Sequence, residues 1–173
     1  MSTSEPRFTT LQQPLTRTDI VTEALPGALD DGAFTPRHLA LLSNALVWAQ
    51  SQAFRQEFAL ATNEWRVLSA LASRPGQSAT EISESLSANK AVISASVNTL
   101  AARGLLVLVD GARRSRALYL TGDGAEMHDR MAPIAMRGQR LIEEELGPAE
   151  LSELNALLQR LTERARRLND RAR

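Results

Sequence analysis

The sequence predicts a mainly α-helical fold with one β-hairpin, in the α+β class. Apolar residues recur three and four positions apart over most of residues 35–168, which is the spacing of a helix face. Breaks such as Pro75-Gly76 and Gly147-Pro148 separate these stretches. Residues 105–109 and 117–120 are short apolar runs on either side of a turn, a pattern typical of a hairpin.

The length and composition limit the class of protein. The chain has 173 residues, of which 43% are hydrophobic, enough for one globular domain with an extension. It contains no cysteine, which excludes disulfides, thiolate metal sites and thiol-based peroxide sensing. No apolar run is long enough for a bilayer span, and residues 1–10 lack the pattern of a secretory signal, so a cytoplasmic location is expected.

Charge is unevenly distributed along a chain whose formal net charge is zero. Residues 1–34 carry two arginines against five acidic residues, whereas residues 103–121 carry four arginines against one acid. Residues 160–173 carry six arginines against two acids. The basic segments could face a polyanion, although a run of charges at the end of a helix is more often simply solvated.

The first 34 residues are interpreted as an N-terminal extension, because prolines interrupt them and no periodicity is sustained. A helix is expected to begin at Thr35-Pro36, with threonine as its cap and proline at its first position. A second helix is expected over residues 62–73, with Trp65, Leu68, Leu71 and Ala72 facing inward.

Residues 78–104 predict two helices joined by a tight turn. Ser78 and Glu81 have the spacing of a capping box for a short helix. Asn89 can cap a longer helix, which Gly104 would end in the left-handed conformation. In that longer helix the apolar and the small polar residues separate onto opposite faces. The apolar residues are Ile93, Val97 and Leu100, and the small polar face consists of Ala91, Ser94, Ala95 and Asn98.

This arrangement is typical of a helix-turn-helix, whose second helix enters the DNA major groove. Small outward side chains allow a close approach to base edges. The hairpin that follows has Arg113, Arg114 and Arg116 near its tip, so it has the character of a wing whose arginines reach phosphates or the minor groove.

Two helices are expected after the hairpin. Thr121 can cap the first, which contains Pro133 and should be kinked near it. The second has a regular apolar seam for packing against another helix. The seam consists of Leu151, Leu154, Leu158, Leu161, Ala165 and Leu168.

Over residues 35–168 the sequence resembles the MarR family (multiple antibiotic resistance regulators) of winged-helix transcription factors. The family pattern in the second helix and the turn after it falls without a gap on Lys90, Ser94, Val97, Leu100, Gly104 and Leu105. The Leu-Thr-x-x-Gly after the wing falls on Leu120, Thr121 and Gly124. The sequence departs from the family where Ala95 and Thr99 replace frequent basic residues and where Ala112 replaces a wing aspartate.

The resemblance implies an obligate homodimer built from the first helix and the last two. Residues 35–60 and 122–173 would then form the dimerisation part, and residues 62–121 the DNA-binding part. The interface residues expected are Leu39, Leu42, Leu46, Leu151, Leu154, Leu158 and Leu161. The resemblance also implies a small-molecule pocket between the two parts, and its candidates are Trp48, Phe58, Trp65, Met127 and Met131. For each of these, an ordinary core or dimer contact is the competing interpretation.

The sequence therefore predicts a DNA-binding transcription regulator, a repressor released by a small aromatic or apolar ligand. The residues expected to contact a pseudo-palindromic operator are Ser78, Thr80, Asn89, Lys90, Ala91, Ser94, Ala95, Asn98, Arg113, Arg114 and Arg116. The alternative is a winged helix that binds another protein. An enzyme is not expected, because the two histidines are far apart in sequence and no nucleotide or nucleophile motif is present. No cofactor and no metal ion are expected.

Overall fold

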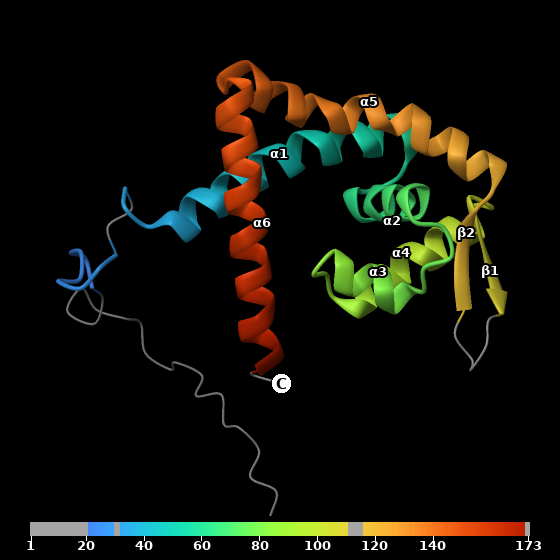
Figure 1. Ribbon diagram of the computed structural model, residues 1–173, viewed down its shortest axis with the longest axis horizontal. Helices are drawn as coiled ribbons and strands as arrows, with labels where there is room; N and C mark the ends of the chain where they lie inside the picture. The colour runs from blue at the N-terminus through green and yellow to red at the C-terminus, as the bar shows by residue number, and fades with distance from the viewer. Residues whose placement is uncertain (1–20, 30–31, 111–115, 172–173) are drawn as a thin grey trace, which may run out of the picture. The chain divides into compact units, whose positions relative to one another are not determined.

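Six helices and one antiparallel hairpin make up the described residues of the computed structural model, which are 21–29, 32–110 and 116–171 (Figure 1). In chain order they are α1 (Thr35–Phe58), α2 (Thr62–Ser73), α3 (Ala79–Ser85), α4 (Lys90–Ala102), β1 (Leu106–Asp110), β2 (Arg116–Leu120), α5 (Gly122–Glu145) and α6 (Pro148–Arg171). The expected order of elements is confirmed, and the fold is mainly helical with a two-stranded sheet.

The chain divides into two compact units, Met1–Ala40 and Leu41–Arg173. In the first unit, His38 Nε2 lies 3.1 Å from the Gly32 carbonyl oxygen, so this histidine is a local contact near the start of α1. Thr35 is the first residue of α1, one position further into the helix than a cap.

The core of the second unit forms where α2 packs against α4, α5 and β2. Its buried residues are Phe54, Phe58, Leu60, Val67, Leu68, Leu71, Ile82, Ile93, Val97, Leu100, Leu105, Leu106, Leu118, Met131 and Ile134. The prediction for α2 was wrong at one position, because Ala72 is exposed and Val67 is buried. A helix covered by several neighbours buries more than the one stripe that its periodicity suggests.

The hairpin begins one residue later than expected in β1 and one residue earlier in β2. Leu106 pairs with Leu120 at one end, and Asp110 pairs with Arg116 at the other. The segment after α2 adds backbone bonds to the free edge of β2, from Gly76 N to Leu118 O (2.9 Å) and from Leu118 N to Gln77 O (3.0 Å). These bonds fix the hairpin against the helices.

The start of α5 locks against the start of the hairpin. Thr121 Oγ1 accepts from Gly124 N at 3.0 Å, as expected for a cap, and donates to the Gly104 carbonyl oxygen at 2.7 Å. Gly104 has φ +69°, which confirms the left-handed position predicted after α4. The proline expected to kink α5 does not divide it, since the helix continues through Pro133 to Glu145.

In the last helix, α6, none of the residues whose burial is described is buried, although the apolar residues keep a regular spacing along one face. Leu161 and Leu168 are each about half exposed. Within the described ranges, the helices are all too short or too polar to cross a bilayer.

Candidate nucleic-acid interface

The start of α3 is fixed by a reciprocal capping box, as predicted. Ser78 N and Ser78 Oγ each donate to Glu81 Oε2 at 2.7 Å, and Glu81 N donates to Ser78 Oγ at 3.2 Å. These hydrogen bonds, first that from the Ser78 backbone, lower the pKa of Glu81, and the charge of Arg74 adds to the effect. The carboxylate is therefore charged near neutral pH and holds the start of α3 in place.

Helix α4 separates its two faces as expected. Asn89 caps it by accepting from Ala91 N at 2.8 Å. Ile93, Val97 and Leu100 are buried, and Ser96 Oγ donates to Glu64 Oε1 of α2 at 2.7 Å. The opposite face, made of Ala91, Ser94, Ala95 and Asn98, is exposed. A hydrogen bond and a packed face thus anchor α4, while small side chains are presented to solvent.

A groove of about 500 Å³ runs between the start of α3, the exposed face of α4 and the hairpin. Its lining residues are Ser78, Ala79, Thr80, Ser94, Val97, Asn98, Leu108, Arg116 and Leu118. The structure therefore brings together five of the predicted DNA-contacting residues, namely Ser78, Thr80, Ser94, Asn98 and Arg116. We call this the α3–α4–wing groove.

Of the other predicted contacts, Asn89, Lys90, Ala91 and Ala95 do not line this groove. Asn89 and Lys90 line a separate polar cavity of about 850 Å³, together with residues of α3 and α6. Arg113 and Arg114 fall outside the described residues. Arg116 is the first residue of β2, and its Nε lies 3.7 Å from Asp110 Oδ1 with both side chains well exposed. Position 112, where the family has an aspartate, is alanine in this chain, and Asp110 is the acidic residue beside a wing arginine.

The candidate ligand residues are distributed between the core and the surface. Phe58 and Met131 are buried, and Trp65 and Met127 pack against the same core. Trp65 stacks on His128, with ring centroids 5.1 Å apart, and Arg130 lies over the ring of Phe58 at 5.3 Å. Trp48 is 67% exposed and stands apart from that core. None of the five lines either of the two cavities described above.

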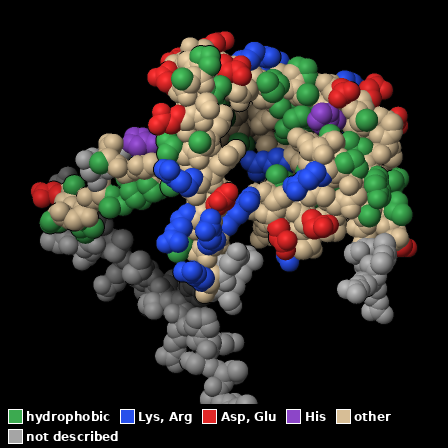
Figure 2. Space-filling view, in the orientation of Figure 1, with side chains coloured by type: hydrophobic (Ala, Val, Ile, Leu, Met, Phe, Trp, Pro, Cys, Tyr) green, Lys and Arg blue, Asp and Glu red, His purple; other side chains and the backbone are tan. Residues whose placement is uncertain are grey.

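The candidate dimer residues leave apolar surface on the single chain. Leu39, Leu42 and Leu161 are exposed, and Leu46, Leu151, Leu154 and Leu158 are half-buried. Figure 2 shows the hydrophobic side chains of one face of the molecule, including a group over the hairpin. On the hairpin, the side chains of Val107, Val109 and Tyr119 are between 40% and 49% exposed.

Two contacts near the interface were not foreseen from the sequence. Arg103, at the end of α4, donates from Nη1 to the carbonyl oxygens of Phe58 (3.0 Å) and Ala59 (3.1 Å). Arg166 of α6 donates to Ser85, the last residue of α3, and to Ser87 in the turn that follows. Both contacts join residues more than forty positions apart, so no local sequence signal marks them.

Residues 60–117, which hold α2, α3, α4 and most of the hairpin, match a family model described as MarR family. This part of the chain is therefore similar to the MarR family. MarR family proteins are transcription regulators and not enzymes, so the comparison supports a DNA-binding regulator and confirms the resemblance seen in the sequence. No curated protein matches the chain.

Solved structures of MarR family proteins share the fold. A MarR/EmrR family transcriptional regulator from Acinetobacter sp. ADP1 has 26% identity and a TM-score of 0.74, over 80% of this chain and 99% of its own. The PcaV transcriptional regulator from Streptomyces coelicolor, solved with its natural ligand, has 22% identity and a TM-score of 0.68, over 80% of this chain and 98% of its own. The transcriptional repressor CouR, solved on a 23-mer DNA duplex, has 24% identity and a TM-score of 0.66, over 76% of this chain and 94% of its own. At these last two identities the likeness is one of fold.

Proposed function

We propose that the chain is a dimeric, sequence-specific transcriptional repressor whose DNA binding is released by a small aromatic or apolar ligand. The observation that carries the proposal is the α3–α4–wing groove, in which polar residues from three elements face solvent together. Base edges are read by hydrogen-bonding side chains on a helix that fits the major groove, and α4 offers such side chains on a narrow surface.

In the proposed complex, α4 enters the major groove with its N-terminus first. Lys90, Ser94 and Asn98 contact bases, and an asparagine amide can bond adenine at two positions. Ser78, Thr80 and the wing arginines contact phosphates, which supply the affinity that depends on salt. Two copies of α4, about 10 base pairs apart, require a pseudo-palindromic operator.

The proposed dimer uses residues 35–60 and 122–173, with residues 1–34 as an extension. Support comes from α6, whose described side chains are all at least partly exposed although its leucines repeat along one face. A helix of this kind is stabilised when its apolar face packs against another helix. CouR on its duplex provides a precedent for this fold on DNA.

The proposed effector site involves Trp48, Phe58, Trp65, Met127 and Met131. Support comes from the stacked Trp65 and His128 rings between α2 and α5, where an aromatic ligand could compete for the same faces. PcaV with its natural ligand provides a precedent for a ligand on this fold. Binding would favour a dimer geometry in which the spacing of the two α4 helices no longer fits the operator.

A protein-binding winged helix is the second candidate. The observation that favours it is the exposed apolar surface of Val107, Val109 and Tyr119 on the hairpin, because such patches often mark protein contacts. In that case DNA would be retained weakly and without sequence preference.

The test is a selection of bound fragments from a sheared genomic library, followed by a salt titration on the enriched fragments. A regulator enriches a pseudo-palindrome, and its log affinity falls steeply with log salt concentration. If no fragment is enriched and retention is weak at every salt concentration, specific DNA binding is excluded and the protein-binding candidate takes its place.

A further inference from the structure

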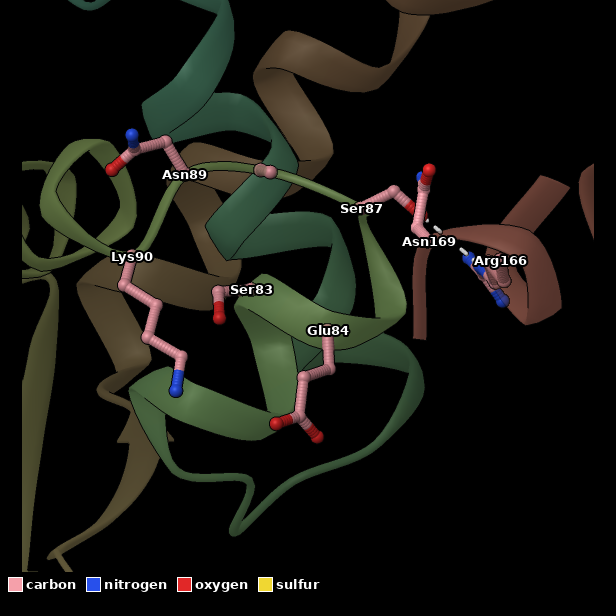
Figure 3. Close-up of a pocket in the computed structure, with 8 residues that line it drawn as sticks. Ser83, Glu84, Ser87, Asn89, Lys90, Arg166 and Asn169 are labelled. Atoms are coloured by element: carbon pink, nitrogen blue, oxygen red, sulfur yellow. Dashed lines mark hydrogen bonds between the residues drawn. The ribbon is translucent and has the colours of Figure 1, made fainter. Parts of the chain in front are cut away.

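Arg166 joins α6 to the turn between α3 and α4. Its Nη2 donates to the Ser85 carbonyl oxygen at 2.6 Å, and its Nε donates to Ser87 Oγ at 3.0 Å. Figure 3 shows this side chain reaching the turn from α6, beside the polar cavity that Lys90 and Asn89 also line. The guanidinium therefore contacts the residues that immediately precede the recognition helix.

The carbonyl that Arg166 binds lies at the end of α3. The last carbonyls of a helix lack partners within the helix. Here the turn itself serves two of them, because Ser87 N donates to Glu84 O at 3.1 Å and Ala88 N donates to Ser83 O at 2.9 Å. The Ser85 carbonyl accepts from the guanidinium, and a cation at this end of a helix is electrostatically favourable.

The hydroxyl that Arg166 binds belongs to a residue in an unfavourable backbone conformation. Ser87 has φ +50°, a left-handed region that residues with a side chain rarely adopt. Two residues later Asn89 caps α4, so the conformation of Ser87 sets the direction in which α4 leaves the turn. Because Arg166 binds the Ser87 hydroxyl, it favours one direction of α4 relative to the turn.

Arg166 lies on the side of α6 away from the exposed leucines. At 3.6 residues per turn, Arg166 is rotated by roughly 140–160° from Leu161 and Leu168. Arg166 therefore faces away from these two leucines, whereas Leu151 and Leu158 of the same seam are rotated from it by only about 60–80°. Helix α6 thus carries the leucines proposed for the dimer and also contacts the turn before α4 through Arg166.

We propose that Arg166 is a positioning residue that fixes the orientation of α4 relative to α6, and thereby the spacing of the two recognition helices in the dimer. This inference rests on the proposed function. Its competitor is a direct contact between Arg166 and a DNA phosphate, which would contribute to affinity on every sequence and to the salt dependence.

The experiment compares Arg166→Gln with Arg167→Gln in the full chain. Arg167 is a matched control, because it is the next residue on the same helix and its Nη2 pairs with Glu163 Oε2 at 3.3 Å within α6. Affinity is measured for the fragment selected by the wild type and for versions with the half-sites one base pair closer or farther. Each is titrated with salt, and sedimentation reports the oligomeric state.

The positioning role predicts that Arg166→Gln stays dimeric and keeps the wild-type salt slope. It loses about tenfold in affinity at the native spacing, within the range of coupling between sites, and discriminates less between spacings. Arg167→Gln behaves like the wild type. Ser87→Ala, which removes an acceptor without changing α6, shows the same direction of change, and the double variant is no weaker than Arg166→Gln alone.

Three results overturn the inference. Arg166→Gln could retain the wild-type preference for spacing, or the losses of the two single variants could simply add. A fall of about two in the magnitude of the salt slope, from one lost contact in each copy of the dimer, with an equal loss on unrelated DNA, would identify a phosphate contact instead. A wild type that selects no operator contradicts the proposed function, whereas a wild type that selects one while Arg166→Gln is unchanged contradicts only the positioning role.

Discussion

Single side chains on the exposed face of α4 differ in what they can contribute to DNA binding. Ala91 and Ala95 allow close approach, whereas Ser94 and Asn98 carry hydrogen-bonding groups into the α3–α4–wing groove. Of the two, Asn98 has the amide that can pair with a base at two positions. It is therefore the residue at which sequence preference should be easiest to change.

Replacing Asn98 with alanine should weaken binding to the operator by about 2–6 kcal/mol, because a good two-point base contact of about 1–3 kcal/mol is lost in each half-site. The affinity for unrelated DNA should stay unchanged, because that affinity comes from phosphate contacts. Fluorescence anisotropy with both duplexes at one salt concentration measures the two quantities. An equal loss on both duplexes would assign Asn98 to the phosphate backbone.

At the scale of elements, the two caps around the turn define where α3 and α4 begin. Glu81 has a lowered pKa in the folded chain, so its charged form stabilises the fold. A lowered folded pKa gives a contribution that is fully present above the usual pKa of glutamate. The contribution is lost as the pH falls through the folded pKa.

Glu81→Gln should therefore lower the melting temperature at about pH 7, and the difference from the wild type should shrink toward about pH 3. Glu84→Gln on the same helix is the control, because Glu84 lies outside the capping box. Circular dichroism melts across this range of pH provide the measurement. A difference that stays constant with pH would mean that the charge of Glu81 contributes nothing to stability.

The junction of α5 with the hairpin depends on one glycine. A Cβ added to Gly124 would overlap the Leu105 carbonyl oxygen, whereas a Cβ added to Gly122 meets no atom within 4 Å. Gly124→Ala should thus destabilise the fold by about 2–3 kcal/mol, as overpacking does, and Gly122→Ala should change it little. Urea unfolding of the two variants tests this, and equal midpoints would contradict the close packing at Gly124.

What the sequence predicted depends on how local the determining contacts are. The caps at Ser78, Asn89 and Thr121 act within three residues, so their spacing in the sequence was enough to place them. Burial in α2 depends on which elements cover it, and for that reason Val67 was missed.

The candidate site followed the same rule. The exposed face of α4 could be read from its helical period. The separation of Lys90 from Ser94 and Asn98 into different cavities could not, because distant elements line them. The contact of Arg166 with Ser85 and Ser87 spans about eighty residues and depends on the return of α6, which no local pattern reports.

At the scale of the whole molecule, apolar surface remains on α1, α5 and α6. Exposed residues there include Leu41, Leu42, Met136, Leu141, Leu157, Leu161 and Leu168. The core gathers around α2 and leaves these helices with little apolar cover. If two copies buried this surface against each other, the dimer would carry two groups of arginines, one from residues 160–173 of each copy.

Leu161→Asp should split the proposed dimer, since it places a charge at the centre of the seam, and specific DNA binding should be lost with it. Gln159→Asp is a matched control, because it adds the same charge about 160° around the helix. Sedimentation velocity and operator binding are measured on both. A Leu161→Asp variant that remains dimeric would exclude the α6 seam as an interface.

The way α4 is anchored has a consequence for how such a regulator can diverge. Its fixation to the rest of the domain uses Ile93, Ser96, Val97, Leu100 and Arg103, none of which lies on the exposed face. Substitutions at Ala91, Ser94, Ala95 and Asn98 can therefore change the preferred DNA sequence at little cost to folding. Gene duplicates could acquire new target sites through a few such steps, and a library randomised at these four positions would be expected to yield folded proteins with altered operators.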